Sequence, residues 1–208
     1  MGIVTISAPY GAAGPEVGPA VATRLGLPFH DRAIPAQVAG RLGVPVAEAE
    51  ANDETVVRGL WRLVESLGTM PDPVGAVVPG APLPDARAYR DQTERVLAEI
   101  AAGDGGVVLG RAGAIVLRDR PDALHVRLDG PRDRRLAAAV ARSGRPRDEV
   151  AGEMAANDRA REAYVRHFYR VDPAAARHYH VVVDATALPL DTVVDIVVSA
   201  ARGRGLGR

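Results

Sequence analysis

The chain has 208 residues, with a hydrophobic fraction of 47% and a charged fraction of 25%, which fits a single globular domain with a sizeable core. Its formal net charge is zero, so no overall field favours nucleic acid or an anionic membrane as a partner. The absence of cysteine excludes disulfides, thiolate catalysis and cysteine metal sites. No apolar run approaches the ~18 residues that a membrane span needs, and we expect a cytoplasmic protein.

The hydrophobic pattern alternates between strand-like and helical segments along the chain. In order, it predicts a strand at 3–7, a helix at 15–25, a weaker strand at 27–30, helical pieces over 33–69, a proline-rich loop at 71–84, a helix at 85–102, a strand at 106–109, a short helix ending at 117, a strand at 123–128, a helix at 131–142, a long polar helix at 147–169, a strand at 179–183 and a helix at 190–201. This alternation favours an α/β fold in which helices cover both faces of a parallel sheet.

The first strand runs into a turn that contains Gly11 and Gly14, and a helix follows at once. Such a turn directs backbone N–H groups and a helix N-terminus at one point, which suits a phosphate group. Proline is tolerated in the first helical turn, and Glu16 is favourable there for the helix dipole. The usual phosphate loop, however, carries a lysine and then a serine or threonine. The chain has no lysine at all, and the two positions are Gly14 and Pro15.

Two other interpretations of this turn remain open. It is compatible with a plain glycine-rich turn between a strand and a helix. It also fits a loose dinucleotide-binding pattern, because Gly11, Gly14 and Gly18 are followed by Asp31 at about the distance of a ribose-binding acid. The dinucleotide interpretation is weaker, since the expected G-x-G start is missing.

Arginines supply the candidate cations for a phosphate site. Arg111 follows Gly110 at the end of a buried-type strand, and Arg90 lies on the helix before that strand. A guanidinium binds phosphate oxygens in a bidentate manner. Residues 158–166 place further arginines at helical spacing, which suits either a solvated helix face or a lid that closes over phosphates. The arginines of residues 132–147 are expected to be solvated. The five histidines show no zinc-ligand spacing, and we expect no metal site built by the chain.

Taken in order, these segments resemble the cytidylate kinase-like branch of the nucleoside monophosphate kinases. The resemblance rests on the opening strand and turn, the Leu-Gly-Leu-Pro-Phe-His-Asp run at 25–31, the Val-Val-Leu-Gly-Arg run at 107–111, the 158–164 segment and the last strand and helix. It implies a three-layer P-loop NTPase-like fold with a parallel sheet, a helical substrate-binding insert and a lid. Within a single domain of 1–208, it implies a core at 1–32, 104–130 and 178–202, an insert at about 33–103 and a lid at about 131–177.

The resemblance also implies a function, which is ATP-dependent phosphoryl transfer to a nucleoside monophosphate, CMP or dCMP first. ATP would bring its own Mg²⁺. The implied roles are catalytic for Arg111, Arg161 and Asp158, and substrate-binding for Asp31, Arg90 and Arg111. The implied ATP-binding residues form the turn and are Gly11, Ala12, Ala13, Gly14, Pro15 and Glu16.

Several positions depart from the family pattern and keep a second function open. Gly14 and Pro15 are two of these departures. Two more follow the Gly-Arg pair, where relatives place an acidic residue and this chain has Ala112 and Ala114. Each lost contact weakens stabilisation of the transition state. The alternative is a catalytically inactive nucleotide-binding paralogue that acts as a sensor or binds a partner. The expected partner is a small-molecule nucleotide, and the composition allows a homodimer without requiring one.

Overall fold

The computed structural model describes residues 2–30, 86–110 and 112–207. Its strands form one parallel sheet in the order β2–β3–β1–β4–β5, with β1 at the centre. The predicted α/β fold with a parallel sheet is confirmed. The strands are β1 (Ile3–Ser7), β2 (Phe29–His30), β3 (Gly106–Leu109), β4 (Ala123–Asp129) and β5 (Val181–Asp184).

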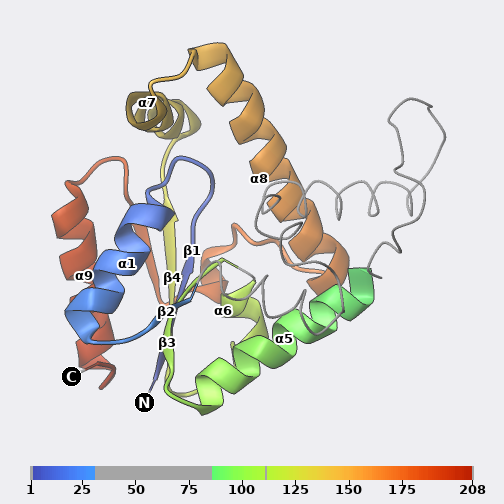
Figure 1. Cartoon of the computed structure of the whole chain (residues 1–208), viewed down its shortest axis with the longest axis vertical. Coiled ribbons are helices and arrows are strands. Elements are labelled where there is room, and N and C mark those ends of the chain that lie inside the picture. Colours follow the sequence, from blue (N-terminus) through green and yellow to red (C-terminus); the bar gives the residue numbers. More distant parts are fainter. Residues whose placement is uncertain (1, 31–85, 111, 208) are drawn as a thin grey trace.

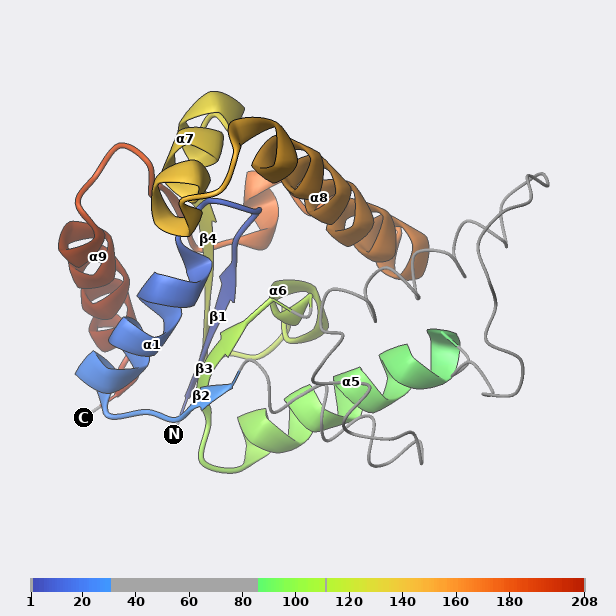
Figure 2. The same ribbon diagram turned by 45° about the horizontal axis from the view of Figure 1, so that its top comes forward.

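Helices cover both faces of this sheet, as Figures 1 and 2 show. On one face α1 and α9 pack side by side, and on the other lie α5 and α6. The helices α7 and α8 form a hairpin beyond the carboxyl end of β4, and we call it the lid hairpin because it falls in the lid predicted at about 131–177. The helices are α1 (Gly14–Leu25), α5 (Ala86–Ala102), α6 (Gly113–Val116), α7 (Arg132–Ser143), α8 (Arg147–Tyr169), the 3-10 turn η1 (Ala176–His178) and α9 (Leu190–Gly203).

The predicted elements agree closely with these bounds, with a shift of two residues at the start of β2, which begins at Phe29 rather than at residue 27, and another near the C-terminus. The last strand begins at Val181 rather than at residue 179, because η1 precedes it and the Tyr179 N–H is bonded to the Ala176 carbonyl. The predicted helical pieces at 33–69 and the proline-rich loop at 71–84 lie outside the described residues.

The sheet separates two apolar clusters because alternate strand residues point to opposite faces. Val4 and Ile6 of β1 pack with Val17 and Val21 of α1 and with the apolar face of α9. On the opposite face, Ile3 belongs to a second cluster with Val96 and Leu97 of α5 and with residues of β3 and β4. The N-terminal end of β1 is thereby fixed between two layers, while its carboxyl end leads to the loop before α1.

The lid hairpin has a small core of its own. Leu136 and Ala139 of α7 pack against Val150 and Met154 of α8, and these four buried residues form a third cluster. None of the helices in the described ranges is both long enough and apolar enough to cross a membrane.

Candidate functional site

The loop between β1 and α1, residues 8–13, has the backbone geometry of an anion site. Gly11 has φ +83°, and Ala13, which caps α1, has φ +60°. Left-handed residues in such a turn direct successive N–H groups toward one side. The N–H groups of Gly14 and Glu16 begin α1 and have no bonding partner among the described residues, as expected of a first helical turn. We call residues 8–14 the phosphate loop.

At the position where a phosphate loop carries its lysine, the structure admits a side chain only if its neighbours shift. A Cβ atom on Gly14 would lie 2.9 Å from the Ala8 Cβ and 3.0 Å from the Leu109 Cδ1. The loop has therefore lost the lysine and also the space that its side chain would need. A cation for a bound phosphate has to come from another element.

The lid hairpin packs directly on the phosphate loop. The Tyr10 side chain packs against the hairpin core, and its hydroxyl donates to Glu153 of α8 at 3.0 Å. A Cβ on Gly11 would lie 2.4 Å from the Arg135 carbonyl oxygen of α7, so only glycine fits this contact. The side chain of Tyr10 thus joins the loop to the hairpin.

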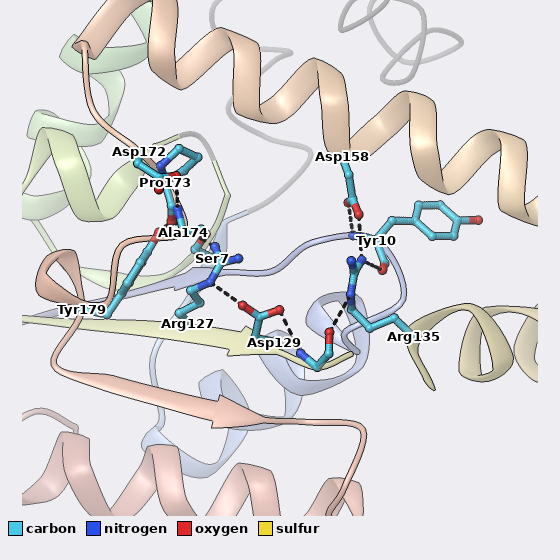
Figure 3. Close-up of polar contacts among 11 residues, drawn as sticks. Ser7, Tyr10, Arg127, Asp129, Arg135, Asp158, Asp172, Pro173, Ala174 and Tyr179 are labelled. Atoms are coloured by element: carbon cyan, nitrogen blue, oxygen red, sulfur yellow. Dashed lines mark hydrogen bonds and ion pairs between the residues drawn. The ribbon is translucent and has the colours of Figure 1, made fainter. Parts of the chain in front are cut away.

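Arg135 and Asp158 connect the loop to both lid helices (Figure 3). The Arg135 guanidinium donates to the Tyr10 carbonyl at 2.7 Å and to the Gly130 carbonyl at 3.0 Å. It also pairs with Asp158 Oδ2 at 2.7 Å. The other oxygen of Asp158 accepts the Tyr10 backbone N–H at 2.8 Å. Arg161, one turn further along α8, donates to the Ala8 carbonyl at 2.8 Å.

A second polar cluster fastens the segment between α8 and β5 to the sheet. Arg127 of β4 pairs with Asp129 at 2.8 Å and donates to the Pro173 carbonyl at 3.0 Å. The Tyr179 hydroxyl donates to the same carbonyl at 2.7 Å, and it lies 3.3 Å from Ser7 Oγ at the end of β1 (Figure 3). These contacts hold the base of the lid next to the phosphate loop.

Carboxylates at the start of α1 and at the end of β5 form ion pairs with arginines of α7. Glu16 in the first turn of α1 forms an ion pair with Arg142 of α7 at 3.2 Å. At the end of β5, the Thr186 hydroxyl donates to Asp184 and keeps the pKa of that carboxyl below its ordinary value. Asp184 thus stays an anion and pairs with Arg134 at 2.6 Å.

The structure brings together some of the predicted site residues and separates another from them. Asp158 accepts the Tyr10 N–H and Arg161 donates to the Ala8 carbonyl, so both contact the loop that leads into the predicted ATP-binding residues 11–16. Arg90, expected at the substrate side, sits on α5, where it donates to Asp91 at 2.9 Å and lies 5.7 Å from the Phe168 ring centre near the end of α8. Asp31 and Arg111 fall outside the described residues.

Arg135 corrects the expectation that the arginines of residues 132–147 are solvated. Its side chain is only 11% exposed, because it lies between the loop and α8. The Arg-Arg pair at 134–135 does not indicate which arginine is buried, because burial depends on partners that are distant in the sequence. Arg134 pairs with Asp184 and Arg135 with Asp158. Tyr10 offered a usable signal, because a large aromatic residue in a glycine-rich turn needs a surface to pack on.

The chemistry of the donors fits a phosphate group and not a bound metal. Unpartnered N–H groups at the start of α1, together with arginines from the lid, suit an anion. Within the described ranges, no group of His, Asp or Glu side chains could hold a metal ion. Pro15 also stands where a phosphate loop carries its Mg²⁺-binding hydroxyl. The donors of the loop therefore suit phosphate oxygens, and at position 15 the loop offers no hydroxyl for Mg²⁺.

The central-strand loop, the sheet order and the lid hairpin define a three-layer P-loop kinase fold. Residues 3–187 match the sequence model of the cytidylate kinase-like family. The chain belongs to this family.

Solved structures agree on the fold. A crystal structure of an uncharacterised protein from Eubacterium ventriosum has a TM-score of 0.66 at 14% identity, over 97% of this chain and 99% of that chain. A gluconokinase from Sinorhizobium meliloti has a TM-score of 0.52 at 16% identity, over 97% of this chain and 92% of that chain.

A curated sequence relative is named uronate isomerase and comes from Corynebacterium glutamicum. It is 29% identical over 138 residues, which is 66% of this chain and 26% of that protein. The chain thus spans about a quarter of the length of this curated relative.

Proposed function

We propose that the chain transfers a phosphoryl group from ATP to a nucleoside monophosphate, with CMP or dCMP as the first acceptor to test. The observation that carries the proposal is the contact of Arg161 with the Ala8 carbonyl, which places a lid guanidinium at a phosphate loop that has no lysine. Membership of the cytidylate kinase-like family supports the acceptor class.

The loop, the arginines of the lid hairpin and the hairpin itself have separate roles in the proposed reaction. The N–H groups of the loop and of the first turn of α1 bind phosphate oxygens. Arg161 and Arg135, from the two helices that meet on the loop, supply positive charge on its lid side. ATP supplies the phosphoryl group and carries its own Mg²⁺. The lid hairpin excludes water by covering the loop, which favours transfer to the acceptor over hydrolysis.

Arg111, Arg90 and Asp31 are proposed on the acceptor side, as the family resemblance implies. Arg90 is engaged with Asp91 in this structure and would have to exchange that contact for the acceptor. The hydrogen bond that Arg90 donates to Asp91 raises the pKa of the guanidinium above its ordinary value. The insert at about 33–103, the lid at about 131–177, the nucleotide as the sole partner and the homodimer remain predictions.

The experiment is a phosphoryl-transfer assay with Mg·ATP and a panel of CMP, dCMP, UMP, AMP and GMP. Arg161→Ala should lower turnover roughly 10³-fold, since a guanidinium at the transferred group is worth that much. Arg111→Ala should have a comparable effect. The control is Arg159→Ala, which removes a guanidinium from the same helix two residues away. Equal rates for Arg161→Ala and Arg159→Ala would contradict the proposed role of Arg161.

A second candidate function is an inactive nucleotide-binding protein that serves as a sensor. It is favoured by the tight fit at Gly14 and by Pro15, which together remove the lysine, its space and the Mg²⁺-binding hydroxyl. Nucleotide binding by calorimetry without turnover on any acceptor of the panel would select this function. Turnover of CMP or dCMP would exclude it.

A further inference from the structure

Asp158 binds the phosphate loop in the way a ligand anion would. One carboxylate oxygen accepts the Tyr10 N–H at 2.8 Å, and the other accepts from Arg135 at 2.7 Å. The side chain is 27% exposed, so it lies at the boundary between the loop and solvent. A loop amide and a guanidinium are the donor pair that phosphate oxygens use in proteins.

The donors keep their places without Asp158. The Tyr10 N–H belongs to a loop whose shape is set by Gly11, which packs against the backbone of α7. Arg135 is independently bonded to the Tyr10 and Gly130 carbonyls. If the Asp158 carboxylate moved away, an amide and a guanidinium would remain aimed at the vacated position, and both would need a new anionic partner.

Neighbouring contacts hold α8 in the position that delivers this carboxylate. Tyr10 packs on the hairpin core, and its hydroxyl donates to Glu153, which precedes Asp158 on α8. Arg161, one turn after it, donates to the Ala8 carbonyl. Three residues along α8 therefore contact the loop, and Asp158 is the one whose carboxylate accepts a backbone N–H of the loop.

We propose that Asp158 is an internal competitor for the phosphate loop, an autoinhibitory contact that a ligand phosphate must displace. This inference rests on the proposed function, because it takes phosphate as the natural occupant of the loop. It gives Asp158 a different role from the catalytic one that the family resemblance implies. Displacement frees the Tyr10 N–H and one bond of Arg135 for the ligand. It also releases α8, so binding of phosphate is linked to movement of the lid.

The test is calorimetric binding of inorganic tripolyphosphate to the whole chain and to Asp158→Asn. The asparagine keeps the size of the side chain and removes its charge, so tripolyphosphate should bind roughly tenfold more tightly, the value of one charge-assisted bond. The matched control is Glu162→Gln, which removes a carboxylate of α8 that pairs with Arg166 at 2.6 Å. Its affinity should stay close to that of the unaltered chain.

A second measurement needs no variant. The backbone amide resonance of Tyr10 in a ¹⁵N spectrum should shift when tripolyphosphate is added to the unaltered chain, because its hydrogen-bond acceptor changes from carboxylate to phosphate. Binding that leaves this resonance unmoved would overturn the proposal even if Asp158→Asn fails to fold.

The outcomes separate this inference from the proposed function. Equal or weaker binding by Asp158→Asn, with tripolyphosphate still bound by the unaltered chain, overturns the competitor role and leaves the proposed phosphate site standing. Tighter binding by Asp158→Asn without turnover on any acceptor supports the competitor role and overturns the kinase. Binding by neither protein overturns both.

Discussion

Two adjacent arginines of α7 illustrate how much position matters at the scale of single residues. Arg135 is 11% exposed and makes three hydrogen bonds, whereas Arg134 is 49% exposed and pairs with Asp184, its one partner in the described part of the chain. A partly buried ion pair is costly to break from one side, because the remaining charge loses its partner. An exposed pair contributes little.

We expect Arg135→Ala to lower the free energy of unfolding by about 2–4 kcal/mol, because it leaves the Asp158 carboxylate and two carbonyls without their donor. Arg134→Ala should cost less than about 1 kcal/mol. Urea denaturation of the two variants measures the difference. Equal losses would show that Arg135 contributes no more than a surface arginine.

Gly14 and Gly152 form a second matched pair. A Cβ on Gly14 meets Ala8 at 2.9 Å, whereas a Cβ on Gly152 of α8 meets nothing within 4 Å. Gly14→Ala should therefore destabilise the chain by about 1–3 kcal/mol through overpacking. Gly152→Ala should be neutral or stabilising by up to about 1 kcal/mol, since alanine favours a helix.

Thermal unfolding of both variants checks this expectation, and a double variant identifies the cause. Adding Ala8→Gly to Gly14→Ala removes the closest contact and should recover part of the loss. Additive effects of the two changes would mean that Ala8 does not limit the space at position 14.

At the scale of elements, the lid hairpin should respond as a unit separate from the sheet. Met154 lies in the core of the hairpin, and Val197 of α9 lies in the main core against α1. We expect Met154→Ala to cost about 2–5 kcal/mol, much of it as local opening of α7 and α8. Val197→Ala should instead weaken protection across the sheet. Hydrogen exchange by mass spectrometry distinguishes them, and uniform loss of protection in Met154→Ala would contradict an independent lid core.

The elements themselves were predictable, because their signals are local. Pro15 and Gly26 mark the two ends of α1, which runs from Gly14 to Leu25, and Gly144 and Pro146 separate α7 from α8. The 3-10 turn η1 was missed, since its three residues carry no periodic pattern.

The candidate site was predictable only in part, for a reason of distance along the chain. Asp158 and Arg161 were predicted because residues 158–164 resemble the lid of the family, and their roles stay predictions. Their partners Tyr10 and Ala8 lie 148 and 153 residues away, and no local pattern encodes such a contact. Arg135 was misjudged for the same reason, because its burial depends on a loop 125 residues earlier.

At the scale of the whole molecule, a histidine in the sheet should make stability depend on pH. His125 of β4 is 2% exposed, and its Nδ1 lies 2.8 Å from the Thr5 hydroxyl of β1. Burial, with His180 stacked on the ring at 5.0 Å, lowers the pKa of His125 to about 4. In the unfolded chain the pKa of His125 returns to its ordinary value of ~6.5. Between about pH 6.5 and 4 the unfolded state therefore binds a proton that the native state does not bind.

Stability should thus be complete above about pH 6.5 and should fall as the pH drops toward 4, by about 3 kcal/mol from this group. Urea denaturation at several pH values measures the slope. His125→Gln should flatten it, and His167→Gln, on the exposed face of α8, serves as the control. An unchanged slope in His125→Gln would assign the acid sensitivity to other groups.

The fastening of the lid base to β4 restricts how the molecule can move. The hairpin leaves the sheet at Gly130, directly after β4, and its returning segment is held at Pro173 by Arg127 of the same strand. Both attachment points therefore lie within a few residues of each other on one rigid strand. A body hinged at two neighbouring points can swing about the line between them but cannot slide. Opening of the hairpin would accordingly be a rotation about this line, and it would have to break the contacts of α8 with Tyr10 and Ala8.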